Sequence, residues 1–362
     1  MAQALALAAR AIGLSEPNPR VGCVIVSADG ARVLGTGHTQ PAGQAHAEIM
    51  ALRDAAARGA DVRGATAWVT LEPCSHHGRT GPCCEALAAA GIARVVASLA
   101  DPNPLVAGQG FARLRAAGVA VEVGPGARES RELNIGFFSR MVRGRPWVRM
   151  KIAASLDGQT ALANGRSQWI TGEAARADGH AWRARAGALL TGIGTVLDDD
   201  PRLDVRLAPV GKQPPLVVVD SRLQTPPAAA LFSVAGRPVW IYAAEAKPDA
   251  QTALEARSAH VSQLAGAGGK VDLAALLKDL AGRGVNELHV EAGFKLNGSL
   301  LREALVDEFL VYLAPKLLGP GRGMVNIGPL EDLAQGVALE FGGIERVGAD
   351  LRVLARVAGR DF

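Results

Sequence analysis

Short apolar runs alternate with amphipathic stretches over roughly the first third of the chain, the pattern of strands alternating with helices. The runs rich in β-branched residues predict strands at Val21–Ser27, Thr66–Leu71, Arg94–Ala100 and Val119–Val123. Apolar residues three or four apart predict helices at Ala4–Ile12, Ala47–Ala57, Pro82–Ala90 and Gly110–Ala117. Gly59, Gly91 and Gly118 stand where three of these helices should end. The alternation indicates an α/β layer with a largely parallel central sheet.

A longer helix is predicted over Arg128–Val142, and the basic, turn-rich Arg143-Gly144-Arg145-Pro146 after it predicts a domain boundary. We therefore expect one domain over residues 1–145 and a second over 146–362. Strands of the second half are predicted at Val148–Ala153, Ala188–Thr191, Leu216–Asp220, Val239–Ala243, Glu287–Glu291 and Glu308–Leu313. Its helices are predicted at Glu173–Ala186, Leu273–Ala281 and Lys295–Ala304.

Composition narrows the class of protein. The 362 residues are 49% hydrophobic and 20% charged, which is typical of a soluble globular protein. The net charge of +4 is small for this length and gives no reason to expect a nucleic-acid partner. No apolar run reaches the roughly 18 residues that span a bilayer, so no membrane association is expected. The stretch Met1–Leu14 lacks a basic start and contains Arg10, and it predicts a first helix instead of a signal peptide.

The four cysteines are too few for a disulfide scaffold, and without a secretory signal they predict a reducing, cytoplasmic location. Cys23 lies inside a short β-rich apolar run and is predicted to belong to the core. Cys74, Cys83 and Cys84 cluster within eleven residues and need another explanation.

Two segments together predict a catalytic zinc site. His46-Ala47-Glu48 opens one predicted helix, and Cys74 and the Cys83–Cys84 pair lie between a predicted strand and the next helix. One imidazole and two thiolates suit zinc, and three protein ligands leave a fourth tetrahedral position for water. Glu48 lies two residues after His46, where a carboxylate can move protons without being a ligand. The arrangement His-x-Glu…Pro-Cys is that of zinc-dependent base deaminases.

The chemistry of such a site explains the residue types. Zinc lowers the pKa of water so that hydroxide can add to a ring carbon that bears an amino group. The carboxylate then carries the proton to the ring nitrogen and to the departing amine. A structural zinc site with His76 or His77 as fourth ligand is the main alternative. The spacing does not decide whether Cys83 or Cys84 is the second thiolate ligand.

On the basis of these residues and the segments around them, the sequence resembles the bifunctional deaminase–reductase family of riboflavin biosynthesis. The matching segments of the first half are Pro17-Asn18-Pro19-x-Val21-Gly22, Gly37-His38, Gly43-x-x-His46-Ala47-Glu48, the eight-residue gap between Cys74 and Cys83, and Asp101-Pro102-Asn103-Pro104. Those of the second half are Lys151–Gly158, Ser167–Thr171, Thr195–Arg206, Val219–Ser221, Val290–Gly293 and Ala314–Gly319. The chain departs from the family at Gly81, where a proline is usual, and a glycine loosens the approach to the second thiolate.

The resemblance implies an N-terminal cytidine-deaminase-like α/β/α domain and a C-terminal dihydrofolate-reductase-like α/β domain. The first domain would deaminate a phosphorylated diaminopyrimidinone riboside with the help of Zn²⁺. The second would reduce the ribosyl group of the product to ribityl with a hydride from NADPH. The only partner implied is this small-molecule substrate, and the sequence leaves a homo-oligomer open.

The resemblance also implies roles for individual residues. The zinc ligands would be His46, Cys74 and Cys83, with Glu48 as the catalytic proton shuttle. The deaminase substrate would be held by Asn18, His38, His76 and Arg79. The reductase substrate would be held by Lys151, Ser167, Arg183, Leu203, Arg206 and Glu291. The nicotinamide cofactor would contact Ala153, Trp169, Thr195, Asp199, Ser221 and Gly293, and Arg222 is a candidate for the extra phosphate of NADPH.

Other functions fit the sequence less well. A Rossmann site is a weak interpretation because Gly192-x-Gly194 lacks the third glycine of the motif. A nucleic-acid base deaminase would need a basic groove with aromatic residues, whereas aromatic residues make up only 4% of this chain. A non-catalytic zinc module that scaffolds a partner would need four protein ligands and no open coordination position.

Overall fold

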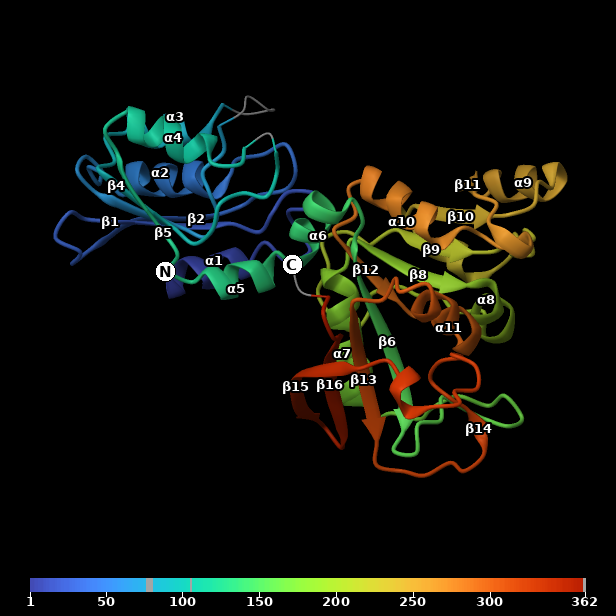
Figure 1. Ribbon diagram of the computed structural model, residues 1–362. Helices are drawn as coiled ribbons and strands as arrows, with labels where there is room; N and C mark the ends of the chain where they lie inside the picture. Colours follow the sequence, from blue (N-terminus) through green and yellow to red (C-terminus); the bar gives the residue numbers. More distant parts are fainter. Residues whose placement is uncertain (76–80, 105, 361–362) are drawn as a thin grey trace. The chain divides into compact units, whose positions relative to one another are not determined.

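The computed structural model describes residues 1–75, 81–104 and 106–360. The chain divides into two compact units, Met1–Gly144 and Arg145–Phe362 (Figure 1). Each unit is an α/β fold built around its own sheet, as the hydrophobic pattern predicts. None of the helices in the described ranges is long and apolar enough to cross a membrane.

The first unit contains a five-stranded sheet in the order β2-β1-β3-β4-β5. Its strands are β1 (Gly22–Val26), β2 (Val33–His38), β3 (Thr66–Val69), β4 (Arg94–Ala97) and β5 (Ala120–Val123). Strands β3, β4 and β5 are parallel, but β1 is antiparallel to both β2 and β3. The prediction of a largely parallel sheet is therefore wrong for the pairs β1–β2 and β1–β3. The cause is the unpredicted strand β2, which forms a hairpin with β1.

Strand β2 escaped prediction because glycines replace the side chains that its buried face would otherwise carry. A Cβ atom at Gly35 or Gly37 would lie 2.2 Å from a backbone oxygen of α2, so only glycine admits the helix there. The helices are α1 (Ala2–Ala9), α2 (Ala47–Ala57), α3 (Cys83–Ala89), α4 (Gln109–Ala116), α5 (Ala127–Leu133) and α6 (Ile135–Arg143). Helices α2, α3 and α4 cover one face of the sheet, and α1 and α5 lie on the other (Figure 1).

The single helix predicted over Arg128–Val142 is in fact two helices, α5 and α6, which meet at Asn134. The Asn134 side chain is buried and binds the backbone of Arg20, far away in the sequence. Its Oδ1 accepts a hydrogen bond from the Arg20 amide at 2.7 Å, and its Nδ2 donates to the Arg20 carbonyl at 3.0 Å. The amphipathic pattern continues through the break, so it gave no sign that tertiary hydrogen bonds interrupt the helix there.

The second unit contains a nine-stranded sheet in the order β11-β10-β9-β8-β12-β6-β13-β16-β15. Its strands are β6 (Trp147–Ser155), β8 (Ala188–Gly192), β9 (Leu216–Val219), β10 (Val239–Ala243), β11 (Ala259–Gln263), β12 (Glu287–Val290), β13 (Glu308–Ala314), β15 (Leu339–Val347) and β16 (Asp350–Val357). The seven strands from β11 to β13 are parallel; β16 is antiparallel to β13, and the edge strand β15 is antiparallel to β16. A separate short ladder joins β7 (Ala161–Leu162) and β14 (Gly321–Arg322).

The helices of this unit are α7 (Glu173–Arg185), α8 (Ile193–Asp199), α9 (Pro248–Glu255), α10 (Leu273–Gly282) and α11 (Phe294–Arg302). The sequence pattern predicts α7, α10, α11 and six of the nine strands of the large sheet to within a few residues. It misses α8, α9, β11, β15 and β16. Strand β15 was missed because a bulge lies between Phe341 and Gly343 and most of its side chains are exposed. No alternation of buried and exposed residues marks such a strand.

Candidate active sites

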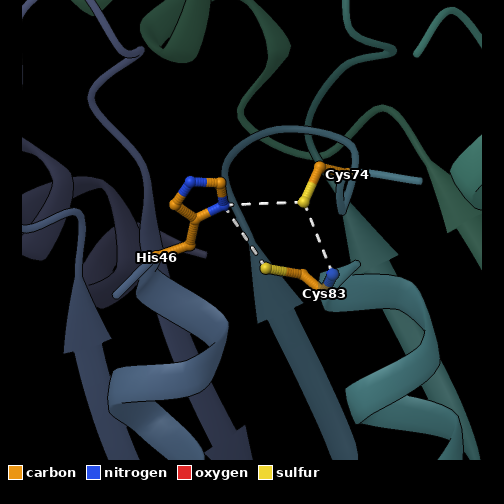
Figure 2. Close-up of side chains that lie close together, drawn as sticks. All are labelled: His46, Cys74 and Cys83. Carbon is orange, nitrogen blue, oxygen red and sulfur yellow. Dashed lines mark hydrogen bonds between the residues drawn. The ribbon is translucent and has the colours of Figure 1, made fainter. Parts of the chain in front are cut away.

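Three segments of the first unit bring His46, Cys74 and Cys83 together (Figure 2). His46 is the N-cap residue of α2, and Cys83 is the first residue of α3. Cys74 lies in the loop that follows β3. The carboxyl end of this strand and the N-termini of α2 and α3 therefore meet at this point. The partial positive charge at a helix N-terminus favours the thiolate form of a cysteine.

The geometry of these three side chains fits a zinc ion. Nδ1 of His46 lies 3.5 Å from Sγ of Cys74 and 3.4 Å from Sγ of Cys83. All three possible ligand atoms lie within 4.8 Å of one another. Nitrogen and sulfur ligands of a tetrahedral zinc ion, with bonds of about 2.0 and 2.3 Å, are about 3.5 Å apart. The donor set and its spacing are therefore those of a zinc site with one coordination position left open.

The structure selects one cysteine of the adjacent pair. Cys83 faces Cys74 and donates its backbone N–H to the Cys74 sulfur at 3.4 Å, whereas Cys84 is buried outside the cluster. Consecutive helix residues point about 100° apart, so both side chains cannot reach the same point. A side-chain hydrogen bond between the two thiols lowers the pKa of Cys74 and raises that of Cys83.

Glu48 lies in the first turn of α2, two residues after His46, and only 3% of its surface is exposed. Burial, together with the nearby Cys74 thiolate, raises the pKa of its carboxyl to about 7. A carboxyl group with such a pKa can both accept and release a proton near neutral pH. Glu48 and the zinc-site residues His46 and Cys74 line the same pocket, which has a volume of about 390 Å³.

The wall of this pocket contains residues with and without a predicted role. Asn18 lines it, as the resemblance implies, but His38 is not among the described residues that do. Asp101 and Arg140 line it too, although no role was predicted for either. Asp101 belongs to a segment already matched to the family, and that match was the available signal. Arg140 lies on α6 and has no motif around it.

Three residues that precede α3 in the sequence bear on the predictions. His76 and Arg79, two predicted substrate contacts, lie outside the described residues. Gly81, the departure from the family pattern, is exposed, and a Cβ atom there would meet no atom of the described residues within 4 Å. Within that part of the chain, no close approach requires the glycine.

The second unit brings three predicted substrate residues together in a charged cluster. Glu291, at the end of β12, accepts two hydrogen bonds from the Arg183 guanidinium at 2.5 and 2.8 Å. The ammonium group of Lys151 lies 3.7 Å from the same carboxylate. Burial alone would raise the pKa of Glu291, but Arg183 and Lys151 lower it well below its ordinary value. Glu291 therefore stays ionised at neutral pH.

Other predicted substrate residues extend this cluster. Arg183 donates to the Asp204 carbonyl at 2.9 Å, and Arg206 binds the Asp204 carboxylate at 2.7 Å. Leu203 adjoins Asp204, is buried, and has a left-handed backbone with φ of +49°. Sequence reasoning missed His289, which is fully buried with Nε2 3.3 Å from Glu291. No contact joins Ser167 to the cluster among the described interactions.

The predicted cofactor residues lie mostly near the carboxyl ends of neighbouring parallel strands. Thr195 is in α8 after β8, Ser221 follows β9, and Gly293 caps α11 after β12. A Cβ atom at Gly293 would lie 3.8 Å from the Thr195 hydroxyl, so these two residues are neighbours. The carboxyl ends of parallel strands, next to a helix that begins at an exposed glycine, can bind the phosphate groups of a dinucleotide.

Buried polar atoms support a ligand at this edge. Thr191 Oγ1, at the end of β8, and Asp220 Oδ1, just after β9, have no hydrogen-bond partner within the described part of the chain. The remaining predicted cofactor residues are more scattered. Ala153 is on β6, Asp199 is the exposed last residue of α8, and Trp169 is 62% exposed with Arg176 4.7 Å above its ring.

Comparison with known proteins gives one consistent family. Residues 1–99 match the family described as the cytidine and deoxycytidylate deaminase zinc-binding region, and residues 146–353 match the RibD C-terminal domain. The chain is 45% identical to riboflavin biosynthesis protein RibD of Escherichia coli, over 97% of this chain and 96% of the relative.

Two solved structures are similar over almost the whole chain. Acinetobacter baumannii RibD is 40% identical with a TM-score of 0.86, covering 99% of this chain and 97% of that one. A Thermotoga maritima protein, described as a diaminohydroxyphosphoribosylaminopyrimidine deaminase/5-amino-6-(5-phosphoribosylamino)uracil reductase, is 32% identical, with the same TM-score and coverage.

Proposed function

The chain belongs to the RibD family of riboflavin biosynthesis proteins, and on that premise we propose which of its residues carry each of two reactions. It is a bifunctional enzyme, with a zinc-dependent deaminase and an NADPH-dependent reductase in one polypeptide. It deaminates diaminohydroxyphosphoribosylaminopyrimidine and reduces 5-amino-6-(5-phosphoribosylamino)uracil, the two substrates in the description of the Thermotoga relative. The fold is that of a cytidine-deaminase-like domain followed by a RibD reductase domain.

We assign deamination to residues 1–145 and reduction to residues 146–362. The assignment is supported by the two compact units and by the zinc-site residues, which all belong to the first of them. In the deaminase domain, His46, Cys74 and Cys83 would hold zinc, and their spacing fits such an ion. Zinc, when bound, supplies the Lewis acidity that makes water nucleophilic near neutral pH.

Glu48 would carry the proton in the deamination. Its carboxylate would take one proton from the attacking water and give it to the ring nitrogen, and would then take the second proton of that water and give it to the leaving amine. This role requires both protonation states to be accessible, which the pKa of about 7 supports. Asn18 would orient the pyrimidine through hydrogen bonds, and the buried Leu71 contributes apolar surface to the same pocket.

In the reductase domain, the ion cluster around Glu291 would orient the ribosyl group. NADPH, when bound, supplies the hydride for carbon 1 of the sugar. Lys151 and Arg183 keep the Glu291 carboxylate ionised, so it can accept hydrogen bonds from sugar hydroxyl groups. Thr195 and the glycine-capped start of α11 would bind the cofactor at the edge of the sheet.

Proposals on location and assembly follow from other features. All four cysteines are free, which suits the reducing cytoplasm. Strand β15 is an edge strand with Leu339, Phe341 and Ile344 exposed, so we propose that the protein self-associates there. Analytical ultracentrifugation should then give a mass at least twice the 37.4 kDa of one chain. A monomer at micromolar concentration would contradict this.

The observation that carries the function is the zinc-compatible cluster beside the buried Glu48 in one pocket. We expect purified protein to release ammonia from the diaminopyrimidine substrate without NADPH, and to oxidise NADPH only once deaminated product is present. Ammonia release and nicotinamide absorbance are followed separately. NADPH oxidation that starts without ammonia release would contradict the proposed order of the reactions.

A further inference from the structure

One face of helix α6 forms part of the deaminase pocket, and the mechanism above gives it no task. Phe137 and the two residues three and four positions after it, Arg140 and Met141, line the same 390 Å³ pocket as His46 and Glu48. Helix α6 is distant in sequence from the zinc-site segments. Its contribution to the pocket is therefore a product of the tertiary fold.

Arg140 changes how the side chains that line this pocket suit a phosphorylated substrate. Three carboxyl groups, those of Glu48, Glu72 and Asp101, line it. Of the described lining residues, Arg140 is the one arginine or lysine. A phosphate group carries nearly two negative charges at neutral pH, so it is attracted to the guanidinium of Arg140 and repelled by those carboxyl groups that are ionised.

Arg140 is held in position by contacts on both sides. Its Nη2 donates a hydrogen bond to the Pro17 carbonyl at 2.9 Å, and its guanidinium lies 5.8 Å above the ring of Phe137. The Pro17 segment is itself fixed, because Asn134 binds the backbone of Arg20 through both of its polar side-chain atoms. Helix α6 and the segment from Pro17 to Arg20 are thus joined by hydrogen bonds on one side of the pocket.

A guanidinium held in this way can bind an anion. It carries five N–H donors, so it can bind a carbonyl oxygen and two phosphate oxygens at the same time. Partial burial lowers the pKa of Arg140, an effect that the neighbouring Glu16 offsets in part. The group nevertheless stays charged at neutral pH, and its reduced contact with water strengthens its attraction for an anion.

We propose that Arg140 binds the phosphate group of the deaminase substrate and sets the preference of this pocket for a phosphorylated riboside. The inference rests on the proposed function, which places the substrate in this pocket. It adds a cation from helix α6 to Arg79, for which the family resemblance implies a contact with the substrate.

The test compares two substrates in one variant. We expect Arg140→Gln to lower kcat/KM for the phosphorylated substrate about 10- to 100-fold, mostly through KM, as for the loss of a hydrogen bond between charged groups. The same substrate treated with phosphatase should be deaminated equally well by the wild type and the variant. Arg143→Gln is the matched control, because Arg143 is on the same helix and its guanidinium binds Ser139 at 2.6 Å. It should leave both substrates unaffected.

Two outcomes would overturn the proposal. An equal fall for both substrates would mean that Arg140 only positions the Pro17 segment, and no fall for either would mean that it does not touch the substrate. Arg140→Lys, which keeps the charge but loses the forked geometry, should recover part of the loss. It also replaces Arg140→Gln as the test variant if the latter does not fold.

A binding measurement separates this proposal from the function on which it rests. Ribose 5-phosphate should inhibit wild-type deamination competitively. It should inhibit Arg140→Gln at least about tenfold more weakly, because the variant lacks the charged hydrogen bond to the phosphate. Equal inhibition of both proteins would contradict the proposal. If the wild type released no ammonia from either substrate, the proposed deaminase function itself would fail, whatever the variant does.

Discussion

Glu48 in the first unit and Glu291 in the second are both largely buried carboxyl groups, yet their surroundings move their pKa values in opposite directions. Burial raises the pKa of Glu48 to about 7, and its nearest ionisable neighbours are His46 and two cysteines. Glu291 experiences a similar burial effect, but Arg183 and Lys151 lower its pKa well below the ordinary value. Burial disfavours the ionised form unless a nearby opposite charge compensates.

The opposite pKa shifts of Glu48 and Glu291 indicate two sources of positive charge for a buried carboxyl group. The cluster in the second unit contains its own cations, so Glu291 stays ionised at neutral pH, as the proposed role in holding a substrate requires. The deaminase cluster offers neutral or anionic donors, and its positive charge has to come from a bound metal ion. The carboxyl group beside it can therefore exchange a proton. Three substitutions test this contrast, from the largest expected effect to the smallest.

Replacing Cys83 should remove the metal-binding capacity of the first site without affecting the second. We expect purified Cys83→Ser to lose zinc and ammonia release, because two ligands cannot hold the ion in a tetrahedral site. Cys84→Ser is the matched control and should keep both, since Cys84 lies outside the cluster. Both variants should oxidise NADPH with already deaminated substrate. Zinc is measured by atomic absorption, and near-stoichiometric zinc in Cys83→Ser would show that the ligand was wrongly chosen.

Glu48→Gln keeps the shape of the side chain but removes its capacity to exchange a proton. We expect deamination to fall about 10²- to 10⁴-fold, the usual contribution of a general acid–base group. Zinc content and the reduction of deaminated substrate should not change, because the reductase site has its own residues. If a folded Glu48→Gln variant also lost reduction of that substrate, a shared active site would replace the two-site interpretation.

Glu291→Gln should change stability in a pH-dependent way. The folded-state pKa of Glu291 lies below its unfolded value of about 4.3, so ionised Glu291 stabilises the fold above that pH. This contribution is lost as the pH falls through the folded-state pKa. The melting temperature of Glu291→Gln should therefore lie several degrees below that of the wild type at pH 7, with a smaller difference below about pH 4.

Calorimetry of the two proteins measures that difference. Glu173→Gln is the control, because the Glu173 side chain is 96% exposed and 3.9 Å from its arginine partner. Exposed ion pairs of this kind add little to stability. The same melting difference at both pH values for Glu291→Gln would show that the ion cluster does not hold the charge as described.

Much of the fold and of the zinc site could be predicted because the signals are local. The helix Ala47–Ala57 was predicted with the bounds that the structure has, since its apolar spacing lies within eleven residues. The segments that carry His46, Cys74 and Cys83 are short motifs at junctions of strands and helices, and the structure brings these side chains together. Cys23 is fully buried, as its apolar surroundings predicted.

The sequence by itself therefore determined the α/β class, most elements and the chemistry of the donor groups, because these depend on residue types and spacings within one segment. The tertiary structure alone decided that Cys83 and not Cys84 joins the cluster, that Asn134 interrupts a helix, and that Arg140 lines the deaminase pocket. It also decided that the hairpin of β1 and β2 makes the first sheet mixed. The physical reason is the same in each case. These features depend on side-chain direction and on contacts between residues far apart in the chain, and no local pattern of hydrophobic and polar residues encodes them.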